Sequence, residues 1–295
     1  MIPHIHKLID ELPPIPFMKL DLIFEGGLFN GSYLIGALYY LRELEIKKQI
    51  EIDRISGCSV GSLTALIYFS DTYHLLEPIY KLTYRHFKKT NHVDIFNYIF
   101  DQLRPHLTEA IMEKLNGRLF ITYYNVKHNE QVVRHKYRSV DDLFDVIRKS
   151  CYCPYIIDHS FLYKKKYVDG FYPYIFPPSH HKKRMHFNIH RFDKLFQGIS
   201  IKNEKTNYRR IMTGMIEAHT FFAYNHSTSI CSFVDDWSVV DHVEHFFYLA
   251  VLKMIVLLLH KMYKLSHMLD KAGISFGYYK LLAVCYTTFI QTYCI

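Results

Sequence analysis

The sequence lacks the features that mark disulfide-rich and metal-binding proteins. Its six cysteines form no dense, evenly spaced framework, so we expect reduced thiols in place of a disulfide scaffold. Cys151 and Cys153 have no second cysteine pair nearby, and this is not the spacing of a zinc site even in a chain with 19 histidines. We therefore predict that the protein needs no metal and no cofactor.

Signals for export and for membrane crossing are also missing. Residues 1–19 contain acidic residues and prolines where a signal peptide would have an apolar segment and a cleavage site. The most apolar run, residues 246–259, is interrupted by Lys253 and is shorter than the roughly 20 residues that cross a bilayer. We expect a buried or interfacial helix there. The protein is predicted to be cytoplasmic, without a transmembrane span and peripheral on membranes at most.

Acidic residues are outnumbered, with a net charge of +8 when histidine is neutral. Two clusters, at residues 164–166 and 180–184, contribute much of the excess. Most such runs are solvated loops, but they also attract anionic partners. Because neither run lies in a recognisable nucleic-acid motif, we expect a lipid or membrane-surface partner and no nucleic acid.

Composition predicts a folded chain throughout, with 49% hydrophobic and 22% charged residues. Residues 1–17 read as an N-terminal extension, a short helix at 6–11 followed by three prolines that end it. We place one domain at 18–200. Helical signals dominate afterwards, so residues 201–295 are predicted to form a mainly helical C-terminal region.

Two strand–turn–helix units follow each other at the start of the domain. Residues 19–24 are apolar like a strand buried on both faces, and a helix at 33–45 follows, with Ser32 as its expected N-cap. A strand at 50–56 and a helix at 62–69 repeat the unit, which implies a parallel sheet. Further helices are predicted at 75–90, 93–103 and 140–150, strands at 119–125 and 131–135, and a small hairpin at 161–168.

Glycine is scarce, with 12 residues, so its few clusters stand out. Gly57 and Gly61 flank Ser59 in a G-x-S-x-G pattern, which arises by chance in roughly one such sequence in forty. The pattern lies between a predicted strand and a predicted helix, the position of a nucleophile elbow. A serine there could simply cap the helix, but the context favours a catalytic nucleophile.

Two further motifs fit an acyl-transfer site. A glycine-rich turn at residues 26–31 lies about thirty residues before Ser59, and its backbone amides could form an oxyanion hole. It matches neither a dinucleotide-binding fingerprint nor a P-loop. Asp169 precedes Gly170 after a strand-like segment. Alone, Asp-Gly is usually a structural turn.

Taken in order, these motifs resemble the patatin-like phospholipases over residues 20–174, including the approach to the aspartate at 150–154. The resemblance implies a three-layer α/β/α sandwich with a mostly parallel central sheet. It also implies a lipid acyl hydrolase of the phospholipase A type, in which Ser59 is the nucleophile and Asp169 its base. The loop residues that would form the oxyanion hole and contact substrate are Gly26, Gly27, Leu28 and Gly31.

Two residues depart from the family pattern. Leu28 stands where a third glycine is usual, and Asn30 where a lysine or arginine is usual. Leucine keeps its backbone N–H but would be strained at a positive φ. This motivates one alternative, a catalytically weakened lipid-binding or membrane-docking protein. The other alternative is a Ser-His-Asp esterase on small esters, although we read histidines such as His159, His186 and His242 as surface or core residues.

Overall fold

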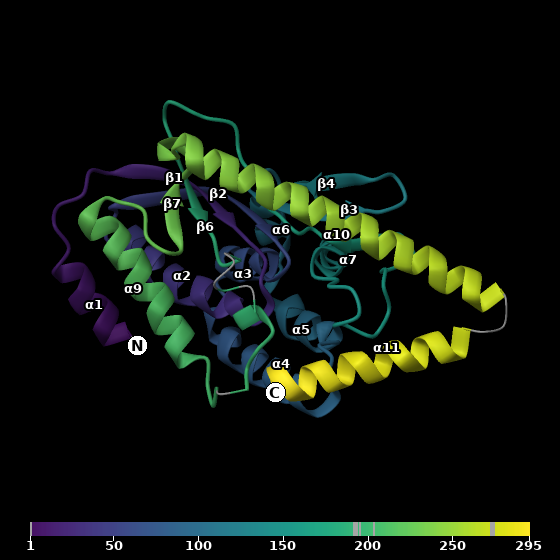
Figure 1. Cartoon of the computed structure of the whole chain (residues 1–295). Helices are drawn as coiled ribbons and strands as arrows, with labels where there is room; N and C mark the ends of the chain where they lie inside the picture. Colours follow the sequence, from purple (N-terminus) through teal and green to yellow (C-terminus); the bar gives the residue numbers. More distant parts are fainter. Residues whose placement is uncertain (1, 191–193, 195, 203, 272–274) are drawn as a thin grey trace.

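A seven-stranded sheet organises the chain (Figure 1). The computed structural model describes residues 2–190, 194, 196–202, 204–271 and 275–295. Six strands follow the order β4-β3-β2-β1-β6-β7, and β5 pairs with β3 outside this path. The strands are β1 Met18–Phe24, β2 Ile50–Cys58, β3 Leu119–Asn125, β4 Glu130–Arg134, β5 Tyr167–Asp169, β6 Lys183–Phe187 and β7 Cys231–Phe233. Neighbours β3, β2, β1 and β6 are parallel, and β4, β5 and β7 are antiparallel.

The two faces of the sheet are covered differently. On β1, Leu20, Leu22 and Phe24 point into the main core, whereas Ile23 points to a smaller cluster on the other face. The main core takes most of the helices, which are α1 Ile2–Asp10, α2 Gly31–Ile46, α3 Val60–Phe69, α4 Leu76–Thr90, α5 Phe96–Leu103, α6 Glu109–Leu115, α7 Val140–Ser150 and α9 Tyr208–Tyr224. Mixed sheet and flanking helices confirm the predicted patatin-like α/β fold.

The last third of the chain contributes to this sandwich as well as extending beyond it. Helix α9 packs along α2, and β7 pairs with β6 at the sheet edge. Helices α10 (Val239–Lys271) and α11 (Ser275–Phe289) then form a hairpin that frames one side of the molecule (Figure 1). Strands from both sides of position 200 therefore belong to one sheet. The domain boundary at residue 200 remains a prediction.

Three local predictions need correction. Helix α2 begins at Gly31 with Asn30 as its N-cap, after the 3-10 turn Leu28–Asn30, so Ser32 lies inside the helix. Residues 161–163 form no strand; an isolated bridge joins Tyr163 to Tyr167, and β5 pairs with β3 instead. Strand β6 was not predicted, because its Lys-Arg-Met-His-Phe sequence lacks an apolar run.

The basic run at 180–184 leads into this strand, and its lysines and arginine are ion-paired. Lys182 is ion-paired with Asp53, Lys183 with Asp236 and Arg184 with Asp235. The expected solvated cluster is therefore mainly a set of structural ion pairs.

The length predicted for the apolar C-terminal helix was wrong. Helix α10 has 33 residues, and its segment Val239–Leu269 is long and apolar enough to cross a membrane, judged by length and composition alone. Only 11% of its most apolar window is buried. The helix continues on both sides of the run at 246–259, where residues 239–245 and 260–271 contain no proline or glycine.

Candidate active site

Ser59 occupies a sharp turn between β2 and α3. Its φ of 51° and ψ of −132° are strained values for a residue with a side chain. A Cβ on Gly57 would lie 2.6 Å from the backbone of Gly61, and one on Gly61 would lie 2.7 Å from the carbonyl oxygens of Phe24 and Glu25. The two glycines are therefore required sterically, as in a nucleophile elbow.

Asp169 lies beside Ser59 although 110 residues separate them in the chain. Asp169 is the last residue of β5, which pairs with β3. Strand β3 in turn pairs with β2, the strand that ends just before Ser59. Its carboxylate is buried next to the Ser59 side chain. It accepts a hydrogen bond from the Phe171 N–H at 2.9 Å. Burial raises the pKa of Asp169 to about 6, although both hydrogen bonds oppose the rise. The structure thus brings the two predicted residues together.

A turn at the end of α7 holds both partners. The Ser59 N–H donates to the Ser150 Oγ at 2.9 Å, and the Asp169 N–H donates to the Tyr152 carbonyl at 3.0 Å. The Gly170 N–H reaches the Ser150 carbonyl at 3.3 Å. Ser150 therefore links the elbow to the aspartate turn. Sequence reasoning noted the segment 150–154 but missed this role, because no spacing rule connects a serine there to an amide 91 residues away.

The glycine-rich turn approaches Ser59 closely, and its residues differ in what they can do. A Cβ on Gly26 would lie 2.8 Å from the Cβ of Ser59 and 3.5 Å from the Sγ of Cys58. Gly31 starts α2, where a Cβ would lie 2.4 Å from Val60. These two glycines are needed for close packing.

Gly27 and Leu28 have the unusual backbone of the loop. Gly27 has φ of 152°, and Leu28 has φ of 47°, in the left-handed region that was expected to be costly for it. In the part of the chain that the structure describes, neither N–H is bonded to an acceptor. Both amides are therefore available to an anionic group.

Asn30 anchors this loop from behind. Its Nδ2 donates to the carbonyls of Ile189 and Lys194, at 2.9 and 3.0 Å, and its Oδ1 accepts from Arg210 Nη1 at 2.7 Å. Arg210 is itself buried on α9 and is paired with Glu204. A guanidinium from α9 thus supplies positive charge directly behind Asn30. The sequence showed only that a basic residue was absent from the loop.

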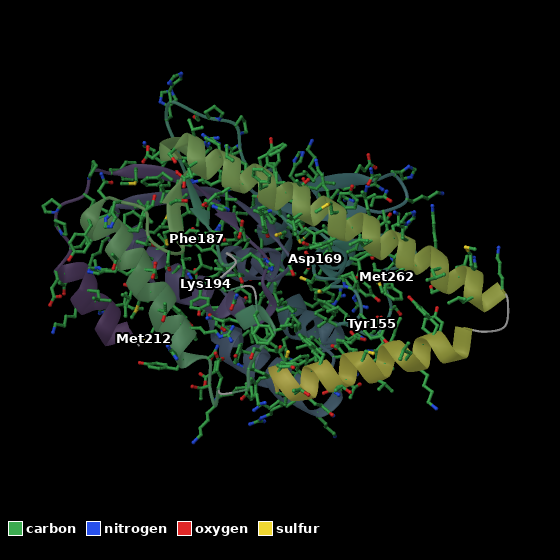
Figure 2. All side chains as sticks on the ribbon, in the orientation of Figure 1. Tyr155, Asp169, Phe187, Lys194, Met212 and Met262 are labelled. Atoms are coloured by element: carbon green, nitrogen blue, oxygen red, sulfur yellow. The ribbon has the colours of Figure 1, made fainter. Side chains whose placement is uncertain are left out.

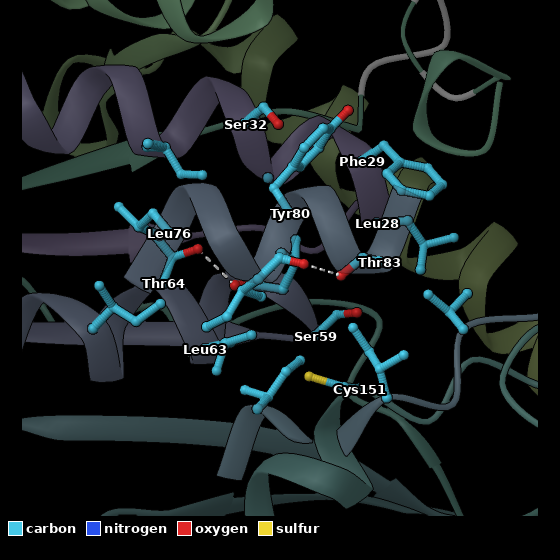
Figure 3. Close-up of a pocket in the computed structure, with 18 of the residues that line it drawn as sticks. Leu28, Phe29, Ser32, Ser59, Leu63, Thr64, Leu76, Tyr80, Thr83 and Cys151 are labelled. Carbon is cyan, nitrogen blue, oxygen red and sulfur yellow. Dashed lines mark hydrogen bonds between the residues drawn. The ribbon is translucent and has the colours of Figure 1, made fainter. Parts of the chain in front are cut away.

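An apolar pocket opens at Ser59 (Figure 3). The space between its walls amounts to about 830 Å³, part of it open to solvent. Two polar groups in its wall are turned away, because the hydroxyls of Thr64 and Thr83 donate to carbonyls of their own helices. The lining residues include Leu28, Phe29, Ile35, Val60, Leu63, Ile67, Leu76, Ile79, Tyr80, Val93, Ile95, Phe96, Ile99 and Ile157.

No histidine in the described part of the chain is hydrogen-bonded to Ser59 or Asp169. His186 is buried and lies 3.2 Å from Glu25, and burial lowers the pKa of His190, which hydrogen-bonds the Gly26 backbone. These residues lie behind the loop and not at the serine. The residues described also include no cluster of metal-ligating side chains.

Two comparisons with known proteins agree with this geometry. The sequence model of the family described as "Patatin-like phospholipase" matches residues 22–172, slightly more than half of the chain. A protein from Mus musculus named "1-acylglycerol-3-phosphate O-acyltransferase Pnpla3" is 26% identical over 165 residues. That alignment covers 52% of this chain and 40% of the relative, so the chain spans well under two thirds of the relative's length.

Proposed function

Because this chain belongs to the patatin-like phospholipase family, whose general chemistry is on the acyl groups of lipids, we propose that it is a lipid acyl hydrolase acting through Ser59 and Asp169. The observation that supports the proposal is that a buried carboxyl group, Asp169, lies beside Ser59, which lines an apolar pocket. The proposed substrates are fatty-acyl esters of phospholipids or related lipids, presented at a membrane surface.

The proposed mechanism has two steps. Asp169 takes the Ser59 proton as the Oγ attacks the ester carbonyl, and the intermediate collapses to an acyl-serine while the departing alcohol receives that proton. Asp169 then deprotonates a water molecule, which attacks the acyl-serine, and it returns the proton to the Ser59 Oγ as the fatty acid leaves. A pKa of about 6 suits Asp169 as a base near neutral pH, better than its ordinary value of 3.8.

The amides of Gly27 and Leu28 are the proposed oxyanion donors, since they lie in the turn beside Ser59 and neither has an acceptor among the described residues. Gly26 and Gly31 have a packing role in this proposal, and Gly57 and Gly61 shape the elbow. The pocket between α3 and α4 would take the acyl chain. No metal or cofactor enters the mechanism.

Fatty-acid release from vesicles of phospholipid and neutral lipid tests the proposal. Ser59→Ala is expected to lower release by about 10³-fold or more, and to abolish labelling by a serine-directed phosphonate. Ser32→Ala is a matched control, because Ser32 is also buried and lines the same pocket. Labelling that persists in Ser59→Ala would assign the reaction to another serine.

Acyl transfer to an alcohol is a second candidate. The relative is named as an acyltransferase, and Ser59 is only 5% exposed, so bulk water does not surround the proposed acyl-serine. Adding 1-acylglycerol-3-phosphate to the vesicle assay distinguishes the two. A diacyl product formed at the expense of free fatty acid supports transfer; unchanged fatty-acid release supports hydrolysis.

A further inference from the structure

The helix α10 has an inner face that belongs to the fold. Leu252 and Val256 are buried, and Val256 packs in a cluster with Tyr124 and Val168, next to Asp169. Tyr248 lies farther towards the start of the helix, where burial raises its pKa and the nearby carboxylates of Glu25 and Asp169 add to the rise. This face therefore covers the sheet beside the candidate site.

The outer face of the same helix is equally apolar and has no cover. Phe246, Phe247 and Met268 are 69%, 63% and 67% exposed. A helix on the surface of a globular domain normally has polar side chains on its outer face. The other large apolar side chains exposed on α10 are Val239, Val240, Val243, Val251, Met254, Ile255, Leu257, Leu258 and Leu265.

Helix α11 continues this surface. Leu281 and Val284 are 63% and 55% exposed, and Phe289 is exposed near its end. In the view of Figure 2, the label of Asp169 lies between the ribbons of α10 and α11. We call the outward residues of α10 and α11 the hairpin surface.

Within residues 245–269 and on α11 the charge of the hairpin surface has one sign, whereas Asp241 and Glu244 are exposed at the start of α10. Residues 245–269 contain no Asp or Glu, and neither does α11. Lys253, Lys261, Lys264 and Lys280 are exposed along it. In the described part of the chain none of these lysines forms an ion pair. Elsewhere, lysines such as Lys182 and Lys183 are paired with aspartates.

We propose that the hairpin surface docks onto an anionic lipid bilayer, lying in its interface. Exposed aromatic and aliphatic side chains bury into the boundary of headgroups and acyl chains, and unpaired lysines attract anionic lipids. A bilayer fits better than a protein partner because the apolar residues are spread over two helices and the charged residues among them, within residues 245–269 and on α11, are all lysines. Since the inner face of α10 packs on the sheet, the helix docks along the membrane and does not cross it.

Docking in this manner places the candidate site at the lipid. Helix α10 contacts the segment that carries Asp169, and on α11 the Tyr286 hydroxyl donates to the Asn91 carbonyl, two residues before Val93 of the pocket wall. Both helices of the hairpin therefore contact segments that adjoin the candidate site. This orientation rests on the proposed function, whereas the docking itself does not.

Vesicle flotation of the full chain tests the docking. The probes are vesicles of phosphatidylcholine alone and vesicles that also contain phosphatidylserine. The variant Phe247→Ser/Leu258→Ser/Met268→Ser is expected to lower the partition coefficient on both by more than 10-fold. The control, Phe17→Ser/Ile46→Ser/Tyr224→Ser, removes similarly exposed apolar side chains elsewhere and should bind like the wild type.

A second variant tests the charge. Lys253→Gln/Lys261→Gln/Lys264→Gln is expected to lose most of the preference for phosphatidylserine, whereas Lys89→Gln/Lys127→Gln/Lys205→Gln should keep it. Equal binding by all variants would overturn the proposal. So would a wild-type dimer in sedimentation that the apolar triple variant makes monomeric, because a second copy would then cover the surface.

The outcome is separable from that of the proposed function. Ser59→Ala should bind vesicles as the wild type does. The apolar triple variant should hydrolyse a short, soluble ester at the wild-type rate while losing vesicle binding. If neither protein hydrolyses the ester but flotation depends on the hairpin surface, the docking stands and the proposed function fails.

Discussion

Ionisation of the buried Asp169 carboxyl group lowers the stability of the folded protein. Since burial raises its pKa from 3.8 to about 6, the folded state is destabilised relative to the unfolded chain once the group ionises. A shift of this size corresponds to about 3 kcal/mol at most. The cost is absent below about pH 4, where both states are protonated, and complete above about pH 6.

We therefore predict that Asp169→Asn changes both the activity and the stability of the protein. The variant is expected to lose ester hydrolysis and to gain free energy of unfolding at pH 8, because no charge is buried. The gain should shrink as the pH falls from 6 to 4. Urea unfolding at several pH values measures the second effect. In the wild type, kcat/KM should rise with pH around a midpoint near 6, and an activity that is flat from pH 5 to pH 8 would contradict Asp169 as the base.

Leu28 is strained where the family usually has glycine. Its φ of 47° costs about 1–2 kcal/mol, and Leu28→Gly removes this strain but makes the unfolded chain more flexible by about 0.5–1 kcal/mol. We expect a small net gain in stability, measured by thermal unfolding, and equal or higher activity, because the amide remains and the pocket mouth widens. A tenfold loss of kcat/KM would show instead that the leucine side chain positions the substrate.

At the scale of elements, the end of α7 fixes the relative position of the two catalytic candidates. Ser150→Ala removes the acceptor of the Ser59 N–H and leaves a buried donor unpaired, which costs about 1–3 kcal/mol. We predict lower kcat with little change in KM, since the pocket is untouched. Steady-state kinetics on a soluble ester test this. Ser160→Ala is a control on an exposed serine ten residues later.

Arg210 connects α9 to the loop in front of it. Lysine cannot reproduce the planar set of donors that reaches Asn30, Glu204 and the carbonyls of Gln197 and Ser200. Arg210→Lys is therefore predicted to lower the free energy of unfolding by about 2–4 kcal/mol and to lower kcat. Chemical unfolding and ester kinetics measure the two effects. Unchanged kcat in a folded variant would show that the anchor has no effect on the loop.

Elements with a clear pattern could be predicted from the sequence. The two strand–helix units, α7 and β3 follow from apolar periodicity, and Ser59 follows from the glycines beside it. Strand β6 and the support from Ser150 and Arg210 could not be predicted. They depend on contacts between segments 91 to 180 residues apart, for which the sequence has no local signal. The role of each site residue still awaits its test.

At the scale of the whole molecule, the chain combines a buried site with an uncovered hairpin. Helix α10 has one face on the sheet and the other exposed. A shift of α10 on contact with a membrane would therefore move side chains that pack against Val168, next to Asp169. The apolar run at 246–259 indicates a helix shorter than α10, because α10 extends from Val239 to Lys271 and its ends are less apolar than the run.

The positions of the cysteines allow the proposed docking of the hairpin to be followed by fluorescence. Of the six cysteines, all within the described residues, Cys285 is the exposed one, and it lies on α11. Burial raises the pKa of Cys58, Cys151 and Cys231, which keeps them protonated and unreactive. A maleimide dye should therefore attach selectively at one point of the hairpin, so that its emission can report arrival at a bilayer in the unmutated protein.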